Sequence, residues 1–183
     1  MAGEVELMKK HVLICGERGV GKTTLVNKLM NEMKVPVFGF MTKVAPADEK
    51  GVKPVYMYPA TGPYVRRDKD NMIGEAGGLV RKVYPEVFEN LGMKLLESKE
   101  GSIAVMDEIG FMEACSETFC RRILKLLESD TPVLATVKAR TDIEFLNEVR
   151  SCEKADLFYI DEENRDELFE KIIPYIREWN RTI

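Results

Sequence analysis

Nine residues near the N-terminus, Gly-Glu-Arg-Gly-Val-Gly-Lys-Thr-Thr at positions 16–24, constrain the fold of this chain more than any other segment. They fit the pattern G-x-x-x-x-G-K-[ST] at Gly16, Gly21, Lys22 and Thr23. Glycines let the backbone curl so that successive N–H groups face one anion, and the N-terminus of a following helix adds a positive field. The pattern therefore predicts a phosphate-binding loop between a strand and a helix.

The segments on both sides of this loop have the character that the motif requires. Residues 11–15 form an apolar, β-branched run of strand length. From position 23 to 33, Leu25, Leu29 and Met33 recur at helical spacing. A glycine-rich turn between two core elements is the alternative, and this strand–loop–helix context argues against it.

Every residue of the loop is a candidate ligand of a nucleotide's phosphates. Lys22 is expected to reach the β- and γ-phosphates and assist catalysis, and the Thr23 hydroxyl is expected to help hold Mg²⁺. Arg18 is a candidate for phosphate contact, although a place at the solvent rim is the stronger expectation. The full set of binding candidates in the loop is Gly16, Glu17, Arg18, Gly19, Val20, Gly21, Lys22, Thr23 and Thr24.

A second motif follows the apolar run at positions 102–106, which ends in two carboxylates, Asp107 and Glu108. Strand ends in an open parallel sheet face the ligand crevice. We therefore expect Asp107 to bind Mg²⁺ and Glu108 to orient or deprotonate an attacking water. Both acids could instead cap a following helix, because acidic residues favour helix N-termini. The phosphate-binding loop earlier in the chain favours the catalytic interpretation.

Strand and helix patterns alternate along most of the chain. Strands are predicted at residues 12–15, 35–42, 103–106, 133–137 and 157–160, and helices at 23–33, 117–128, 143–149 and 166–179. Pro174 is expected to kink or restart the last helix. The alternation predicts an α/β fold with a mostly parallel central sheet flanked by helices, in one domain spanning residues 1–183.

Residues 44–80 interrupt this alternation with many prolines and glycines. Positions 53–58 have the alternating aromatic residues of a short strand or hairpin arm, and the rest is predicted to be loop. A long structureless loop is unusual in a domain of this size unless it has a function. We interpret the segment as a hairpin and loop insertion that acts as a lid near the nucleotide.

Composition excludes several classes of partner and site. The net charge of −4 gives no electrostatic support for nucleic-acid binding. No run of 18 apolar residues exists and the first ten residues lack a secretion signal, so we expect a cytoplasmic protein without a membrane partner. Four cysteines without a C-x-x-C motif and a single histidine argue against zinc. A monomer is favoured, although no residue pattern fixes the oligomeric state.

The spacing Asp107-x-x-Gly110 also matches the D-x-x-G of GTPase switches. The guanine-reading sequence N-K-x-D is absent from the corresponding place, where residues 138–142 read Lys-Ala-Arg-Thr-Asp. Base selectivity is therefore expected to be loose, with both ATP and GTP as ligands.

Four segments together resemble one family, the small P-loop nucleoside-triphosphatases of the THEP1 type, called cancer-related nucleoside-triphosphatase in animals. They are residues 16–25, 39–42 (Gly-Phe-Met-Thr), 105–113 (Val-Met-Asp-Glu-Ile-Gly-Phe-Met-Glu) and 163–166 (Glu-Asn-Arg-Asp), in the family's order. The resemblance implies a RecA-like three-layer fold and Mg²⁺-dependent hydrolysis of NTPs to NDP and phosphate with broad base tolerance. It also implies that Asn164 and Arg165 lie after the last strand, near the base or phosphates. From the residues alone, a polar helix start is equally compatible with that segment.

Two other functions remain open at this point. A nucleoside or nucleotide kinase on a related fold would transfer the γ-phosphate to a small acceptor, with Arg66, Arg67, Arg81 or Arg140 clamping a second phosphate. A nucleotide-gated binding module would hold the nucleotide without turnover and recruit a partner.

Overall fold

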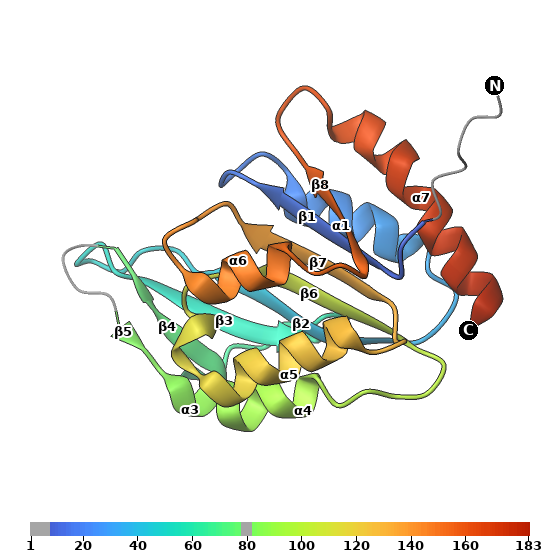
Figure 1. Ribbon diagram of the computed structural model, residues 1–183. Coiled ribbons are helices and arrows are strands. Elements are labelled where there is room, and N and C mark those ends of the chain that lie inside the picture. Colours follow the sequence, from blue (N-terminus) through green and yellow to red (C-terminus); the bar gives the residue numbers. More distant parts are fainter. Residues whose placement is uncertain (1–7, 78–81) are drawn as a thin grey trace, which may run out of the picture.

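One eight-stranded sheet organises the computed structural model, which describes residues 8–77 and 82–183 (Figure 1). The strand order is β5-β4-β3-β2-β6-β7-β1-β8. Five neighbouring strands are parallel: β2 (Val37–Val44), β6 (Ile103–Ile109), β7 (Val133–Lys138), β1 (His11–Gly16) and β8 (Ala155–Tyr159). Three antiparallel strands extend the sheet beyond β2: β3 (Lys53–Pro59), β4 (Met72–Ala76) and β5 (Lys82–Val83). The central strands are almost continuously apolar because both faces of the sheet are covered.

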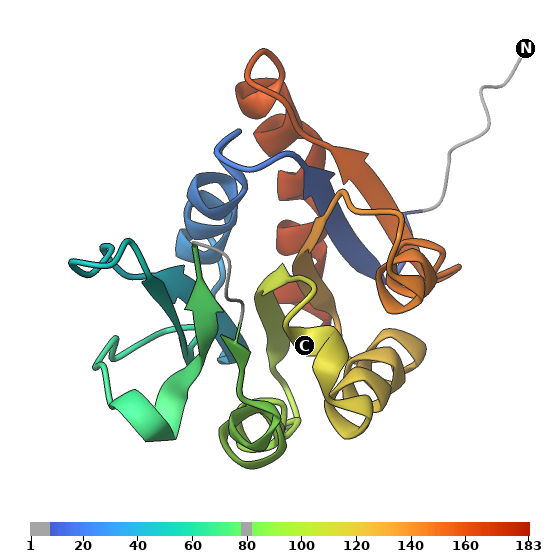
Figure 2. The ribbon, with the colours of Figure 1, turned by 90° about the vertical axis from the view of Figure 1, so that its left-hand side faces the viewer.

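Helices pack on both faces of this sheet (Figure 2). One face carries α1 (Lys22–Asn31) and α7 (Arg165–Thr182), which contact each other. The opposite face carries α5 (Glu117–Glu128), α6 (Glu144–Arg150) and the helical run α3 (Pro85–Val87), η1 (Phe88–Gly92) and α4 (Met93–Leu95). Strand residues alternate between the two cores: Leu13 packs in the α5 core, whereas Val12 and Ile14 pack in the α1–α7 core. The predicted three-layer α/β architecture with a mostly parallel central sheet is confirmed.

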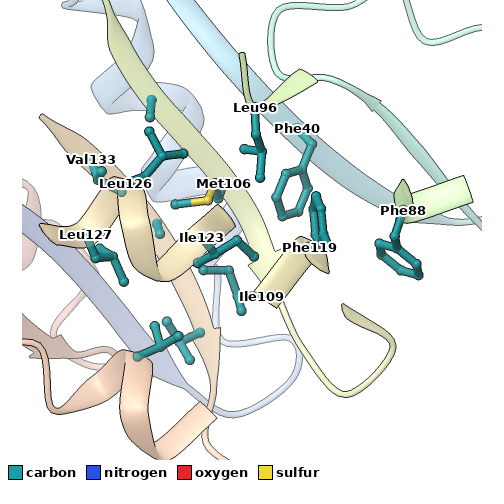
Figure 3. Close-up of a cluster of buried hydrophobic side chains, with 14 of the residues drawn as sticks. Phe40, Phe88, Leu96, Met106, Ile109, Phe119, Ile123, Leu126, Leu127 and Val133 are labelled. Carbon is teal, nitrogen blue, oxygen red and sulfur yellow. The ribbon is translucent and has the colours of Figure 1, made fainter. Parts of the chain in front are cut away.

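Aromatic packing around Phe119 joins α5 to the sheet and to the 85–95 helical run (Figure 3). The ring of Phe119 lies 5.5 Å from that of Phe40 and 5.2 Å from that of Phe88, centroid to centroid. All three side chains are fully buried, and each such burial stabilises the fold by about 1.5–3 kcal/mol. Gly92 passes so close that a Cβ there would lie 2.7 Å from the Phe119 ring. α5 begins after Ser116, whose Oγ accepts a hydrogen bond from the Phe119 N–H.

The insertion contains more regular structure than its sequence predicted. The arm at 53–58 is confirmed as β3, but the rest is not simply loop, because α2 (Asp68–Asn71) and β4 follow it and β4 joins the sheet. The buried side chain of Asn71 organises the connection: it accepts a hydrogen bond from the Arg67 N–H and donates to the carbonyls of Met57 and Val65. Residues 78–80 lie outside the described residues. A single domain over residues 1–183 with this insertion as a lid stays a prediction.

Two helical segments differ from the sequence-based expectations. The run at 85–95 was not predicted, although Pro85 in its first turn and the apolar spacing of Phe88, Leu91 and Leu95 could have indicated it. α7 continues through Pro174, so of the kink or restart predicted there the restart is wrong and the kink stays a prediction. Proline removes one backbone hydrogen bond there, and the buried side chains beside it, Ile173 and Tyr175, anchor the helix on both sides. Within the described part of the chain, the helices are too short or too polar to cross a membrane.

Candidate active site

The loop between β1 and α1 leaves the N-terminus of α1 open. Gly19 and Gly21 have φ angles of 88° and 105°, a backbone region that side chains disfavour. Gly16 admits no side chain because a Cβ would lie 2.4 Å from the Ile160 carbonyl oxygen. No side chain caps α1, and its first turn carries no acidic residue. The N–H groups of that turn and the helix dipole are therefore available to an anion, and phosphate binding by this loop stays a prediction.

Lys22 lies under this loop and is almost fully buried, with 6% of its surface exposed. Its ammonium donates to the carbonyl oxygens of Gly16 and Glu17, both at 2.8 Å, and lies 3.0 Å from Oε2 of Glu108. An ammonium has three N–H donors, so all three have a protein acceptor. A phosphate that binds Lys22 must replace at least one of these oxygens.

Asp107 lies in β6 with its carboxylate buried beside the loop. Its Oδ1 accepts a hydrogen bond of 2.5 Å from the Thr136 hydroxyl, whereas Oδ2 is buried without a hydrogen-bond partner. Burial raises the pKa of this carboxyl, opposed by the hydrogen bond from Thr136 and by the nearby Thr23 hydroxyl. A buried oxygen without a partner is costly, and a divalent cation would satisfy it. A carboxylate oxygen and a nearby threonine hydroxyl are suitable donors for Mg²⁺, so the residues fit the predicted metal.

Glu108 follows in the same strand, with its side chain toward the cleft. Its Oε2 contacts Lys22 and its Oε1 lies 3.5 Å from Nζ of Lys138, the last residue of β7. The Glu108 N–H donates to the Thr42 hydroxyl at 3.3 Å, and the β6–β7 register shifts between Met106 and Ile109. The alternative that Asp107 and Glu108 cap a helix is wrong, because both are strand residues and Ser116 caps α5.

These groups share a cleft of about 730 Å³ at the carboxyl ends of the central strands. Among the sequence candidates, the residues that line it are Arg18, Gly19, Gly21, Lys22, Thr23, Thr24, Asp107 and Glu108. Gly16, Glu17 and Val20 are not in the lining: the carbonyls of Gly16 and Glu17 hold Lys22, and Val20 packs against the α1–α7 core. Arg18 lines the cleft from an exposed position on the loop, and its contact with phosphate stays a prediction.

Sequence reasoning missed several cleft residues on other elements. Lys138 was noted only as part of a missing guanine motif, and Glu113 only as part of a family motif. Glu113 is 3% exposed and its Oε2 accepts a hydrogen bond from the Gly110 N–H at 2.8 Å. Burial raises the pKa of the Glu113 carboxyl to about 7. Other residues of the cleft lining are Thr42, Val44, Lys53, Val55, Ile73, Phe111 and Met112, together with Arg140, which the kinase alternative had named.

Asn164 and Arg165 lie on the other side of the loop, outside this cleft. The Asn164 side chain accepts a hydrogen bond from the Asp161 N–H and donates to the Tyr159 carbonyl, so it stabilises its own turn before α7. Arg165 lies against Gly21, where a Cβ would come within 2.7 Å of its Cδ, and it lines a smaller pocket of about 160 Å³. The segment therefore starts a helix, and a nucleotide contact by Arg165 stays a prediction.

Residues 11–173 match the protein-family model described as NTPase. This chain belongs to the NTPase family. This chain is 32% identical to nucleoside-triphosphatase THEP1 of Thermotoga petrophila over 176 residues, which cover 93% of this chain and 94% of that protein. Over 186 residues it is 28% identical to the human cancer-related nucleoside-triphosphatase, covering 93% and 98%.

Solved structures of the NTPase family agree with this fold. The crystal structure of THEP1 from Aquifex aeolicus matches with a TM-score of 0.69 and 26% identity, over 91% of this chain and 98% of that one. The solution structure of the human nucleoside triphosphatase, at 24% identity and a TM-score of 0.69, supports the fold. The predicted family, the P-loop NTPase fold and the enzyme class of nucleoside-triphosphatase are confirmed.

Proposed function

We propose that this enzyme hydrolyses the γ-phosphate of ATP, GTP and other nucleoside triphosphates, with Mg²⁺, to give NDP and phosphate. One observation carries the proposal: the Glu108 carboxylate lies 3.0 Å from the loop lysine, beside the buried Asp107, at one end of the cleft. Phosphate clamping, a metal-binding carboxylate and a base for water are the groups that phosphoryl transfer to water requires.

Binding of the phosphates is assigned to the loop and the α1 N-terminus. Backbone N–H groups from Gly19 to Thr24 take the β- and γ-phosphate oxygens, and Lys22 exchanges a protein oxygen for a phosphate oxygen. Thr23 and Asp107 would hold Mg²⁺, which neutralises charge on the β- and γ-phosphates when bound. The unpartnered Oδ2 of Asp107 supports that role.

The chemical step is assigned to Glu108. When Lys22 turns to the phosphates, the Glu108 carboxylate accepts a proton from a water. The water oxygen forms a bond to the γ-phosphorus while the bond from that phosphorus to the bridging oxygen breaks. NDP leaves with the bonding electrons, and the water's proton stays on Glu108 until it is released to solvent. General-base catalysis of this kind contributes about 10²- to 10⁴-fold.

Broad base tolerance belongs to the same proposal. The groups assigned above contact phosphates, which ATP, GTP, CTP and UTP share, and the chain lacks the guanine-reading N-K-x-D sequence. The net charge of −4 also supports a small-molecule substrate rather than nucleic acid. We propose a monomer acting in the cytoplasm.

Phosphate release from the four NTPs tests this function. The purified protein is expected to release phosphate from all four with Mg²⁺, and EDTA is expected to stop the reaction. Glu108→Gln should lose activity, whereas Glu117→Gln, an exposed ion-paired glutamate on α5, should keep it. No release from any NTP, or full activity in Glu108→Gln, contradicts the proposal.

A kinase is the second candidate, favoured by the apolar part of the cleft lining. The apolar side chains that line the cleft include Val44, Val55, Ile73, Phe111 and Met112. Water needs no such lining, whereas a nucleoside acceptor would pack on it. Of the four arginines considered for an acceptor phosphate, Arg140 lines the cleft, and Arg81 lies outside the described residues. Label from γ-labelled ATP appearing on an added nucleoside or nucleoside monophosphate would identify a kinase, and label appearing only as free phosphate would identify a hydrolase.

A further inference from the structure

Lys138 occupies a fixed place between the phosphate-binding loop and the two carboxylates. It ends β7, which lies between β1 and β6 in the sheet, and its Cα pairs in register with Gly16 at the start of the loop. Its carbonyl oxygen accepts a hydrogen bond of 2.5 Å from Nη1 of Arg150 on α6. The backbone that carries this lysine is therefore held from both sides.

The side chain of Lys138 is directed into the cleft by its neighbours. A Cβ on Gly110 would lie 3.2 Å from both Cδ and Cε of Lys138, so the glycine leaves room for the lysine stem. The ammonium lies 5.2 Å from the centre of the Phe111 ring, within the range of a cation–π interaction. Its Nζ reaches to 3.5 Å from Oε1 of Glu108.

Two ammonium groups thus flank one carboxylate, with Lys22 on Oε2 and Lys138 on Oε1 of Glu108. Their surroundings differ. Lys22 is nearly buried and held by two further carbonyl oxygens, whereas the Lys138 side chain is 39% exposed at the open side of the cleft. Arg140, another cation of the cleft, is paired with both carboxylate oxygens of Asp142. Compared with Lys22 and Arg140, Lys138 is therefore less restrained and better placed to approach a phosphoryl group next to Glu108.

We infer that Lys138 is the cation that stabilises the γ-phosphoryl group during its transfer, an inference that rests on the proposed hydrolysis. Negative charge on the equatorial oxygens and the leaving oxygen must be stabilised while the phosphorus–oxygen bond breaks. Lys138 donates N–H groups to a γ-phosphoryl oxygen and keeps its proton, while the water's proton goes to Glu108. The enzyme thereby supplies this positive charge from its own chain, a role that an arginine performs in many nucleotide hydrolases.

The test compares Lys138→Met with a matched control. Methionine is also unbranched but carries no charge. We expect kcat to fall about 10²- to 10³-fold, with KM for ATP changed by less than about threefold, since ground-state binding is not removed. Lys138→Arg should recover part of the rate because it restores the charge. Lys171→Met removes an exposed lysine of α7 that is paired with Glu167, and its kcat should match the wild type.

Binding of a transition-state mimic separates this role from a structural one. Lys138→Met should weaken the complex with ADP and aluminium fluoride by a factor similar to the loss in kcat, while the affinity for ADP alone stays within about threefold. Lys138→Met should weaken this complex by the same factor when Glu108 is already replaced by Gln. Such a result would show that Lys138 does not act only by positioning the Glu108 carboxylate. Equal loss of both affinities, or no weakening in the Glu108→Gln background, overturns the inference.

The outcomes also separate this inference from the proposed function. If the wild type turns over and Glu108→Gln abolishes turnover while Lys138→Met leaves kcat within threefold, the hydrolysis stands and the role of Lys138 is wrong. If the wild type hydrolyses no NTP, the proposed function is wrong and the inference is overturned with it.

Discussion

Nζ of Lys22 lies 3.0 Å from Oε2 of Glu108, a contact that joins the phosphate-binding loop to the end of β6. Each partner is assigned a different task, the lysine on the phosphates and the carboxylate on the attacking water. Lys22 must give up at least one of its three acceptors to bind phosphate, and the Glu108 carboxylate is freer to accept a proton once its ammonium partner has moved away. Phosphate binding and activation of the base are therefore linked through one ion pair.

Glu108→Gln should uncouple these two events. Loss of the base is expected to lower kcat about 10²- to 10⁴-fold. Loss of the carboxylate's charge should also make Lys22 easier to displace, so a non-hydrolysable ATP analogue should bind more tightly than it does to the wild type. Calorimetric titration with that analogue measures the affinity, and phosphate release measures the rate. Weaker analogue binding in Glu108→Gln would contradict the linkage, and Glu117→Gln serves as the control.

Asp107→Asn should separate metal use from folding. The buried carboxylate has a raised pKa and an oxygen without a partner, so replacing it with a neutral side chain of the same shape should not lower the free energy of unfolding in EDTA. The Mg²⁺ concentration for half-maximal phosphate release should rise at least about tenfold. Urea unfolding and a Mg²⁺ titration measure the two effects. An unchanged Mg²⁺ requirement would remove Asp107 from the metal site.

Thr136→Val tests the support of that carboxylate. The Thr136 hydroxyl is fully buried and donates to Oδ1 of Asp107. Its removal leaves that oxygen without the donor, and the free energy of unfolding should fall by about 1–3 kcal/mol. In the double variant with Asp107→Asn the loss should be smaller, because no buried charge then needs the donor. Equal losses in the two backgrounds would show that the hydrogen bond does not matter for this charge.

His11 should make the protein less stable in acid. Burial lowers the pKa of His11 from 6.5 to about 4 in the folded protein. Between these values the unfolded chain takes up a proton that the folded protein does not, so stability is lost as the pH falls from 6.5 to about 4. The shift corresponds to about 3 kcal/mol over that range. Urea unfolding at pH 7, 6 and 5 should show a shallower loss for His11→Gln than for the wild type.

Glu113 should act in the opposite direction. Its pKa is about 7 when folded, against 4.5 as the ordinary value. The folded protein therefore holds a proton that the unfolded chain releases, and the stability from this group is present below pH 4.5 and lost as the pH rises through 7. Glu113→Gln imitates the protonated acid and should be more stable than the wild type at pH 8, with a smaller difference at pH 5. The same urea series measures it, and equal differences at both pH values would contradict the assignment.

Local sequence was sufficient to predict the strand–loop–helix segment and to place Asp107 and Glu108 near the end of a strand beside it. The glycines, the lysine and the flanking strand and helix are contiguous in the chain, and the two acids end an apolar run. Lys138 lies next to Glu108 only because β7 is placed between β1 and β6, and alternation of strands and helices does not specify that order. The sequence of one chain therefore indicates which residues belong to the cleft, but it does not indicate which of them lie next to each other.

The insertion shows a different limit. Short strands such as β4 and β5 carry little pattern of their own, and they are regular because β3 offers an edge with which β4 pairs. Asn164 shows a third limit, since the side chain of a polar residue after a strand can either bind a ligand or form hydrogen bonds within its own turn. Here its side chain bonds Asp161 and Tyr159, which only coordinates can reveal.

The three oxygens around Lys22 also bear on what happens after the bond to the γ-phosphorus is broken. The carbonyls of Gly16 and Glu17 belong to the loop itself, so they stay within reach of the ammonium throughout a turnover. Once phosphate has left, they compete with the remaining diphosphate for the same N–H donors. If the enzyme hydrolyses NTPs as proposed, the same loop that binds the phosphates also supplies the acceptors to which Lys22 returns as the products leave.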